Sequence, residues 1–177
     1  MTREAGRAVL IAVLAGACDS PAGPDPIPAE RFGAVTAVIG GRQWGSSYFP
    51  DSTIAFFSPA TGELQITGQQ VTAEIWPTLR LRAESSGGPA AYPIVRYGGL
   101  ASGEWYEPES GERPRGDAGM RGYLSTGAVG DSLVIEELDM TTRVIRGRFS
   151  FTARLLRSDR EVRLTGRFAG RVLLPAR

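Results

Sequence analysis

The chain has 177 residues, with 20 basic and 19 acidic side chains, a net charge of +1 and no histidine. Every basic residue is arginine, so lysine is absent too. Serine and cysteine nucleophiles usually need histidine, Schiff bases need lysine, and zinc sites draw mainly on cysteine and histidine. These compositions exclude those catalytic and metal classes, and a net charge near zero makes nucleic acid a poor partner.

The N-terminus has the pattern of a secretory signal. Arg3 and Arg7 precede an apolar run from Ala8 through Ala17. A charged region followed by a short apolar region is typical of an exported precursor. The run is too short for a membrane-spanning helix, which needs roughly 20 apolar residues. We therefore expect residues 1–17 to be a cleaved signal peptide.

A possible lipid anchor follows the apolar run. The segment Leu14-Ala15-Gly16-Ala17-Cys18 resembles the lipobox of bacterial lipoproteins, and Cys18 is the single cysteine of the chain. The resemblance implies that Cys18 is acylated and becomes the mature N-terminus. The protein would then be held on the extracytoplasmic side of the bacterial cell envelope, at the inner or the outer membrane. The alternative is ordinary secretion, with Cys18 left as a thiol.

Residues 18–31 are expected to form a linker. Proline stands at nearly every second position from Ser20 to Pro28. This pattern favours an extended, polyproline-like chain of about 3.1 Å per residue. Such a spacer would hold the following domain roughly 30 Å from the bilayer.

Residues 32–177 are predicted to form one all-β domain. The chain holds 23 glycines and 12 prolines, and short apolar segments alternate with turn residues. This pattern predicts an antiparallel β-sandwich or a lipocalin-like β-barrel of about nine to ten strands. From Ile145 to Leu155 apolar or small and polar residues alternate strictly, and a hairpin tip is expected at Ser158-Asp159. In the final segment the residues expected on one face are Val162, Leu164, Gly166, Phe168 and Val172, and those on the other are Arg163, Thr165, Arg167 and Arg171. The expected strands are Gly33–Ile39, Thr53–Phe57, Glu63–Thr67, Thr72–Ala83, Ala91–Tyr97, Gly103–Glu107, Gly119–Thr126, Ser132–Glu137, Val144–Leu156 and Glu161–Leu174.

Two stretches of this domain carry a family resemblance. Residues 34–44, with the sequence AVTAVIGGRQW, resemble the opening strand, glycine turn and tryptophan of uncharacterised bacterial secreted lipoproteins. Residues 135–139 and 145–153 are similar to the closing hairpin of the same family. The resemblance implies secretion and a β fold, and it implies no activity.

Charge is unevenly distributed along the domain. Nine acidic residues and three arginines lie from Glu104 to Asp139, whereas ten arginines and two acidic residues lie from Thr141 to Arg177. Cross-strand ion pairs between the two regions are the structural interpretation. The functional alternative is a basic face that binds anionic head groups or polysaccharide. The candidate residues for this face are Arg146, Arg148, Arg163, Arg167 and Arg171.

Acidic residues offer two further hypotheses. A hydrolase built without histidine would need a pair of carboxylates, and Glu136, Glu137 and Asp139 are candidates by residue type. Asp139 also lies between two strands, where it is expected to accept backbone hydrogen bonds in a turn. A second acidic cluster could ligate calcium, but it lacks the ordered spacing of an EF-hand and is expected to be a solvated loop. Its members are Glu104, Glu107, Glu109, Glu112 and Asp117.

Aromatic residues are expected to serve mainly as core. We assign Trp44 and Trp76 to the core, and leave Trp105, beside the acidic loop, as a candidate ligand contact.

Taken together, the sequence predicts a non-enzymatic envelope lipoprotein without cofactor or metal. Its domain would bind a small apolar or glycan ligand in an aromatic-lined cavity, or an envelope protein through an exposed apolar or arginine-rich patch over a filled core. The alternative is a carboxylate-dependent hydrolase of envelope or extracellular glycans, which requires two facing carboxylates in a cleft.

Overall fold

The computed structural model describes residues 29–47, 51–71, 76–85, 87–96, 100–108 and 120–175. The predicted signal peptide, Cys18 and most of the linker lie outside these ranges. The described residues form eleven strands in one hydrogen-bonded sheet, and no helix. The all-β prediction is confirmed. The strands are β1 Ala34–Ile39, β2 Arg42–Gly45, β3 Thr53–Ser58, β4 Glu63–Gln69, β5 Thr78–Glu84, β6 Ala90–Pro93, β7 Ala101–Pro108, β8 Met120–Ser125, β9 Ser132–Asp139, β10 Val144–Leu155 and β11 Glu161–Leu173.

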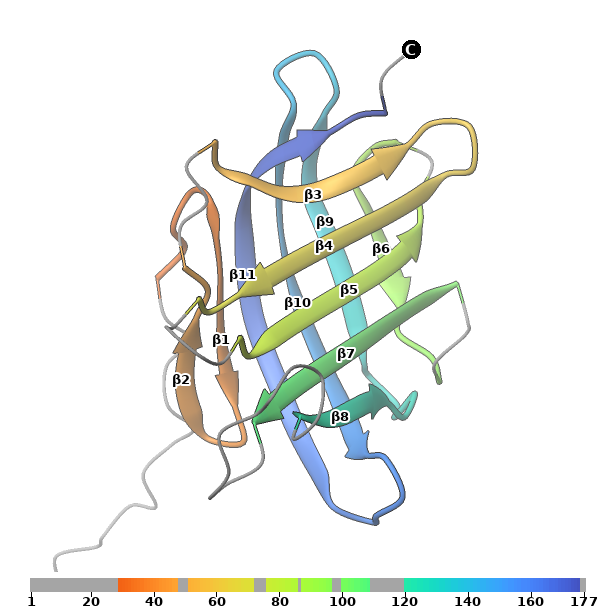
Figure 1. The fold of residues 1–177 in the computed structure, drawn as a ribbon. Helices are drawn as coiled ribbons and strands as arrows, with labels where there is room; N and C mark the ends of the chain where they lie inside the picture. The colour runs from red at the N-terminus through yellow and green to blue at the C-terminus, as the bar shows by residue number, and fades with distance from the viewer. Residues whose placement is uncertain are drawn as a thin grey trace, which may run out of the picture.

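The sheet closes on itself through the long β10–β11 hairpin, as Figure 1 shows. Strand β11 pairs first with β1 and then, in parallel, with β3, while β10 pairs first with β9 and then with β8. The pairings β11-β3-β4-β5-β7-β8-β10 therefore return to β11 and make a ring of seven strands. Outside this ring, β1 and β2 extend the sheet beyond β11, and β9 and β6 extend it beyond β10, so β2 and β6 are the edge strands. The fold is thus a two-layered sheet closed like a barrel.

The structure differs from the predicted elements in several places. The strand predicted at Thr72–Ala83 begins at Thr78 among the described residues, and the one predicted at Ala91–Tyr97 ends at Pro93. Strand β2 has four residues and was not predicted, because so short a segment after a glycine turn shows no alternation. The contact between β11 and β3 is parallel, whereas every other pairing between named strands is antiparallel. Long-range pairing of this kind leaves no local signature in a sequence.

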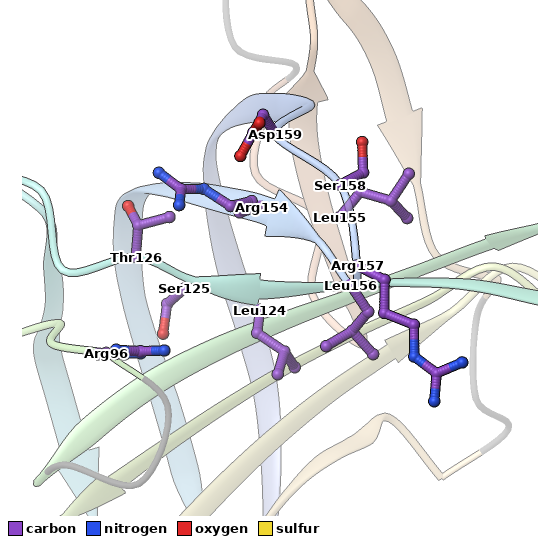
Figure 2. A pocket seen from close by; sticks show the side chains of 10 residues that line it. All are labelled: Arg96, Leu124, Ser125, Thr126, Arg154, Leu155, Leu156, Arg157, Ser158 and Asp159. Atoms are coloured by element: carbon purple, nitrogen blue, oxygen red, sulfur yellow. The ribbon is translucent and has the colours of Figure 1, made fainter.

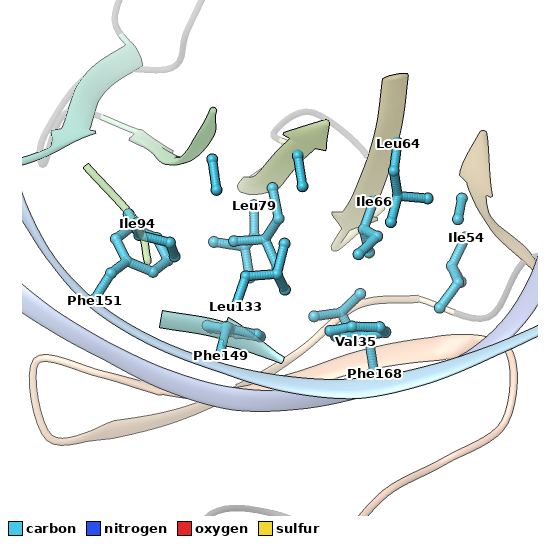
Figure 3. Packing of buried hydrophobic residues seen from close by; sticks show 14 of the residues in the cluster. Val35, Ile54, Leu64, Ile66, Leu79, Ile94, Leu133, Phe149, Phe151 and Phe168 are labelled. Carbon is cyan, nitrogen blue, oxygen red and sulfur yellow. The ribbon is translucent and has the colours of Figure 1, made fainter. Parts of the chain in front are cut away.

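The core lies between the two layers, and aromatic rings fill it. Phe151 of β10 reaches across to β7, where a Cβ atom on Gly103 would lie 2.4 Å from the ring. Gly166 stands opposite Phe149 in the β10–β11 pairing, and a Cβ there would also lie 2.4 Å from the ring. Glycine is required at both positions because the rings occupy the space of a side chain. Figure 3 shows rings of β10 and β11 pointing toward aliphatic side chains of β4 and β5: Phe149, Phe151, Phe168, Leu64, Ile66 and Leu79.

Candidate functional site

An open groove lies at the end of the molecule where the β3–β4 and β9–β10 turns meet the last residues of β11. Phe56 and Leu173 are neighbours in the parallel β3–β11 pairing, and their side chains are 37% and 52% exposed. The groove has a volume of about 1090 Å³. We call it the apolar groove; its lining residues are Phe56, Pro59, Ala60, Met140, Thr141, Arg143, Leu173, Leu174 and Pro175.

One wall of the apolar groove is the β9–β10 turn, which Asp139 organises. Its carboxylate accepts hydrogen bonds from the Thr141 amide at 2.7 Å, the Thr142 amide at 3.2 Å and the Thr142 hydroxyl at 2.7 Å. This confirms the predicted turn role. The hydroxyl bond, followed by the two amide bonds, holds the pKa of Asp139 below its usual 3.8. The carboxylate thus has the contacts of a turn residue.

The turn gives a pH prediction. Because the folded pKa of Asp139 lies below that of the unfolded chain, its stabilising contribution is fully present above the unfolded value and is lost as the pH falls through the folded value. We expect Asp139→Asn to be less stable than the parent chain at neutral pH and to converge with it in acid. Urea unfolding over a pH series measures this. Asp159→Asn, a carboxylate that accepts no hydrogen bond within the described residues, is the control; a constant difference for Asp139→Asn would contradict the assignment.

A second hollow lies where β8 meets the β10–β11 hairpin, and Figure 2 shows the residues around it. Its volume is about 580 Å³, within the range of small-ligand pockets. We call it the arginine pocket, because three of its ten lining residues are arginines. The ten lining residues are Arg96, Leu124, Ser125, Thr126, Arg154, Leu155, Leu156, Arg157, Ser158 and Asp159.

The predicted basic face on β10 and β11 exists, and several of its arginines are paired. Arg146 contacts Glu137 at 3.1 Å, opposite it on β9, and Glu30 at 3.2 Å. Arg148 contacts Glu136 at 3.5 Å. These contacts confirm the expected cross-strand ion pairs. Because each is exposed to solvent, each is worth at most about 1 kcal/mol.

Three ligand candidates remain on this face, and Arg171 lies opposite Val144 at its far end. Arg163 donates to the buried carboxylate of Asp131, and also to the Ser150 hydroxyl at 2.7 Å and the Thr152 hydroxyl at 3.0 Å. Arg167 lies directly opposite Arg148 across β10 and β11, and has no ion-pair partner in the part of the chain that the structure describes. The charge of this face is therefore partly neutralised. Neither the apolar groove nor the arginine pocket lies at its centre.

The hydrolase candidates do not form a facing pair. A β-bulge opposite Arg146 and Gly147 leaves Glu136 unpaired, so Glu136 and the adjacent Glu137 both reach outward to arginines. Asp139 lies in its turn. None of the three faces another carboxylate across a hollow within the described residues.

The acidic cluster is divided between the two faces of β7. Glu104 and Glu107 are three positions apart on this strand, so their side chains leave from opposite faces. Glu104 accepts a hydrogen bond from the Tyr106 hydroxyl at 2.9 Å. Glu109, Glu112 and Asp117 lie outside the described residues. No group of three potential metal-binding side chains occurs among the residues that are described.

The tryptophans depart from expectation at one position. Trp105 is 4% exposed and packs edge-on against Trp44, with 5.3 Å between ring centroids. Trp105 is therefore a core residue, and Trp44 packs against the core as expected. The core assignment of Trp76 was wrong: its side chain is 53% exposed, in the segment just before β5.

Glu107, which was expected in a solvated acidic loop, instead lies half-buried on β7 beside Trp105, so that expectation was wrong for this residue. Glu107 accepts hydrogen bonds from the Tyr123 hydroxyl at 2.7 Å and from the Trp105 indole at 3.4 Å. Burial, followed by the hydrogen bond to Glu107, raises the pKa of Tyr123 above its usual 10.0. Alternation along β7 could have indicated the position of Glu107, because its side chain lies on the same inward face of the strand as Gly103 and Trp105.

Comparisons with family models, curated proteins and solved structures found no match to this chain. A search of the described residues for a membrane-crossing helix, of sufficient length and apolar character, found none.

Proposed function

We propose that this chain is a non-enzymatic lipoprotein of the bacterial cell envelope, anchored on the extracytoplasmic side through Cys18, whose β domain binds an envelope protein in the apolar groove. The observation that carries this proposal is the pair Phe56 and Leu173. Two large apolar side chains stand on neighbouring strands, exposed to solvent, in the lining of a groove of about 1090 Å³. Contiguous exposed apolar surface of this kind is typical of protein-binding sites.

The packing of the interior supports a surface site over an enclosed one. A lipocalin-like carrier needs a cavity between its layers, and here Phe151 extends to the backbone of β7 at Gly103. The carboxylates proposed for hydrolysis are engaged in ion pairs and in a turn. Both observations favour binding at the surface.

Site-specific photo-crosslinking in cells tests the proposal. A photoreactive phenylalanine analogue at Phe56 in the full chain is expected to give one discrete crosslinked product, and Leu173→Ser is expected to abolish it. The same analogue at Val71, which is 49% exposed and does not line the groove, is the matched control. No product from position 56, or the same product from both positions, would refute the groove.

The same cells test the anchor. Incorporation of labelled fatty acid and recovery in the membrane fraction should both be lost in Cys18→Ser. Retention of the label in that variant would refute lipidation at Cys18, without bearing on the groove.

A further inference from the structure

Three loops that are distant in sequence lie together beside the arginine pocket. Ser125, at the end of β8, donates a hydrogen bond to the carbonyl of Val95 at 2.8 Å. Gly127 packs closely on Arg96, the residue after Val95. A Cβ atom on Gly127 would lie 2.8 Å from the amide nitrogen of Arg96. The β10–β11 hairpin completes the group, because its residues line the same pocket as Arg96. We call this surface the loop face; it comprises Val95, Arg96, Leu100, Val129, Leu156 and Arg157.

The loop face presents apolar side chains at loop positions, where polar residues are usual. Val129, in the turn before β9, is fully exposed, and Leu100 and Leu156 are 66% and 55% exposed. A single exposed apolar residue is ordinary on a protein surface. Here three of them stand on loops that lie near one another, because Val95 also donates to the Ala101 carbonyl at 3.1 Å. Exposed apolar residues grouped in this way mark interaction sites. Val129 does not line the arginine pocket, whereas Leu156 lines it and is exposed as well.

Arginines border these apolar residues. In Figure 2, Leu124 and Leu156 lie between Arg96 on one side and Arg157 on the other. Neither Arg96 nor Arg157 has an ion-pair partner among the described residues. Arg154, by contrast, donates twice to Glu161, at 2.7 Å and 3.0 Å, so its charge is already compensated.

The backbone at Arg157 adds a second observation. Its φ of 62° lies in the left-handed region, where a residue other than glycine is strained. An arginine thus occupies a hairpin-tip position that glycine would fill at lower cost. Ser52 and Arg143 have the same left-handed backbone, with φ of 59° and 57°, so the strain marks a tight turn and does not by itself assign a task to Arg157.

We infer that the loop face docks on an anionic lipid surface, with Arg96 and Arg157 at headgroup phosphates and with Val129 and Leu156 inserted at the boundary of the acyl chains. Apolar residues bordered by basic ones are the pattern of interfacial membrane binding. The basic face of β10 and β11 lacks this combination, since Arg146 and Arg148 are paired with glutamates and the outward positions between them and Arg163 are polar. This inference is independent of the apolar groove and of acylation at Cys18.

Vesicle flotation of unacylated protein tests the inference. A chain from Asp19 to Arg177 includes every strand found among the described residues, since these strands lie between Ala34 and Leu173. It is expected to bind vesicles of phosphatidylcholine with about one-third phosphatidylglycerol far better than pure phosphatidylcholine. Equal binding to the two vesicles, or none to either, would overturn the inference.

Paired variants locate the surface. Arg96→Gln with Arg157→Gln should weaken binding to the anionic vesicles about 25-fold, from roughly fivefold per arginine. The control, Arg148→Gln with Arg167→Gln, removes the same charge from the β10–β11 face and should leave binding nearly unchanged. Equal losses in both double variants would mean that net charge alone attracts the protein, and would overturn the assignment to the loop face.

A third comparison separates a lipid surface from a soluble anion. Val129→Ser with Leu156→Ser keeps every charge and is expected to lower vesicle binding. Soluble glycerol phosphate, at the same headgroup concentration, should fail to displace the parent chain, because it offers no apolar contact. Displacement by glycerol phosphate, with unchanged binding of the serine variant, would reassign the arginines to a soluble phosphate ligand.

Discussion

Replacing Phe151 with alanine is expected to lower the free energy of unfolding by about 3–5 kcal/mol. The side chain is fully buried, and its ring extends from β10 to the backbone of β7 at Gly103. Its removal would leave a cavity between the two layers that the surrounding strands, hydrogen-bonded on both sides, cannot collapse to fill. Urea unfolding followed by tryptophan fluorescence measures the loss.

Two further variants test whether the loss comes from the packing of Phe151 against Gly103. Phe56→Ala removes an equal side chain that is 37% exposed, and should cost about 1 kcal/mol or less. Gly103→Ala would place a methyl group against the Phe151 ring, and should cost about 1–3 kcal/mol through overpacking. If Phe151→Ala and Phe56→Ala cost the same, the interior would not be filled at this level, and an enclosed ligand site would regain support.

Replacing Asp131 with alanine is expected to have the second large effect, a loss of about 3–5 kcal/mol. The carboxylate is buried and accepts hydrogen bonds from the Ala128 amide at 3.1 Å and the Thr152 amide at 3.0 Å, besides the guanidinium of Arg163. It therefore joins the β8–β9 turn, β10 and β11. Alanine would leave two backbone donors without their acceptor.

Two further variants separate the parts of this contact. Asp131→Asn keeps one acceptor oxygen and should lose about half as much stability as alanine. Arg163→Gln should cost less still, because its side chain is 46% exposed and solvent replaces the lost contact. Urea unfolding of the set gives the order. A loss for Arg163→Gln as large as for Asp131→Ala would show that the ion pair, and not the two amide bonds, carries the effect.

The strands with regular alternation could be predicted from the sequence, and the closure of the sheet could not. Apolar or small and polar residues alternate from Ile145 to Leu155 in β10 and from Glu161 to Phe168 in β11, so the sequence indicates both the hairpin and its buried face. Closure depends on β3 meeting β11 in parallel over a few residues, at Ala55 and Phe56, and no local pattern marks that meeting.

Side-chain roles were predictable where they depend on neighbours in one hairpin. The ion pairs of Arg146 and Arg148 follow from the opposite charges of adjacent strands. The direction of Glu136 does not, because alternation alone would send it to the face opposite Glu137, and the bulge changes that phase. The grouping of Arg96 with Arg157 was also beyond the sequence, since loops far apart along the chain create it.

The closed ring also constrains when the chain can fold. Strands β1, β3 and β10 all hydrogen-bond to β11, the last strand of the described chain, so two of the earliest strands must wait for the latest one. Contacts of such high sequence separation fold slowly, on the millisecond to second scale typical of β-barrels. A chain that emerges N-terminus first, whether from a ribosome or from an export channel, therefore stays open until its final strand is released. During that delay β1 and β3 lack β11 as a partner, so their apolar side chains stay uncovered on that side until the last strand is released.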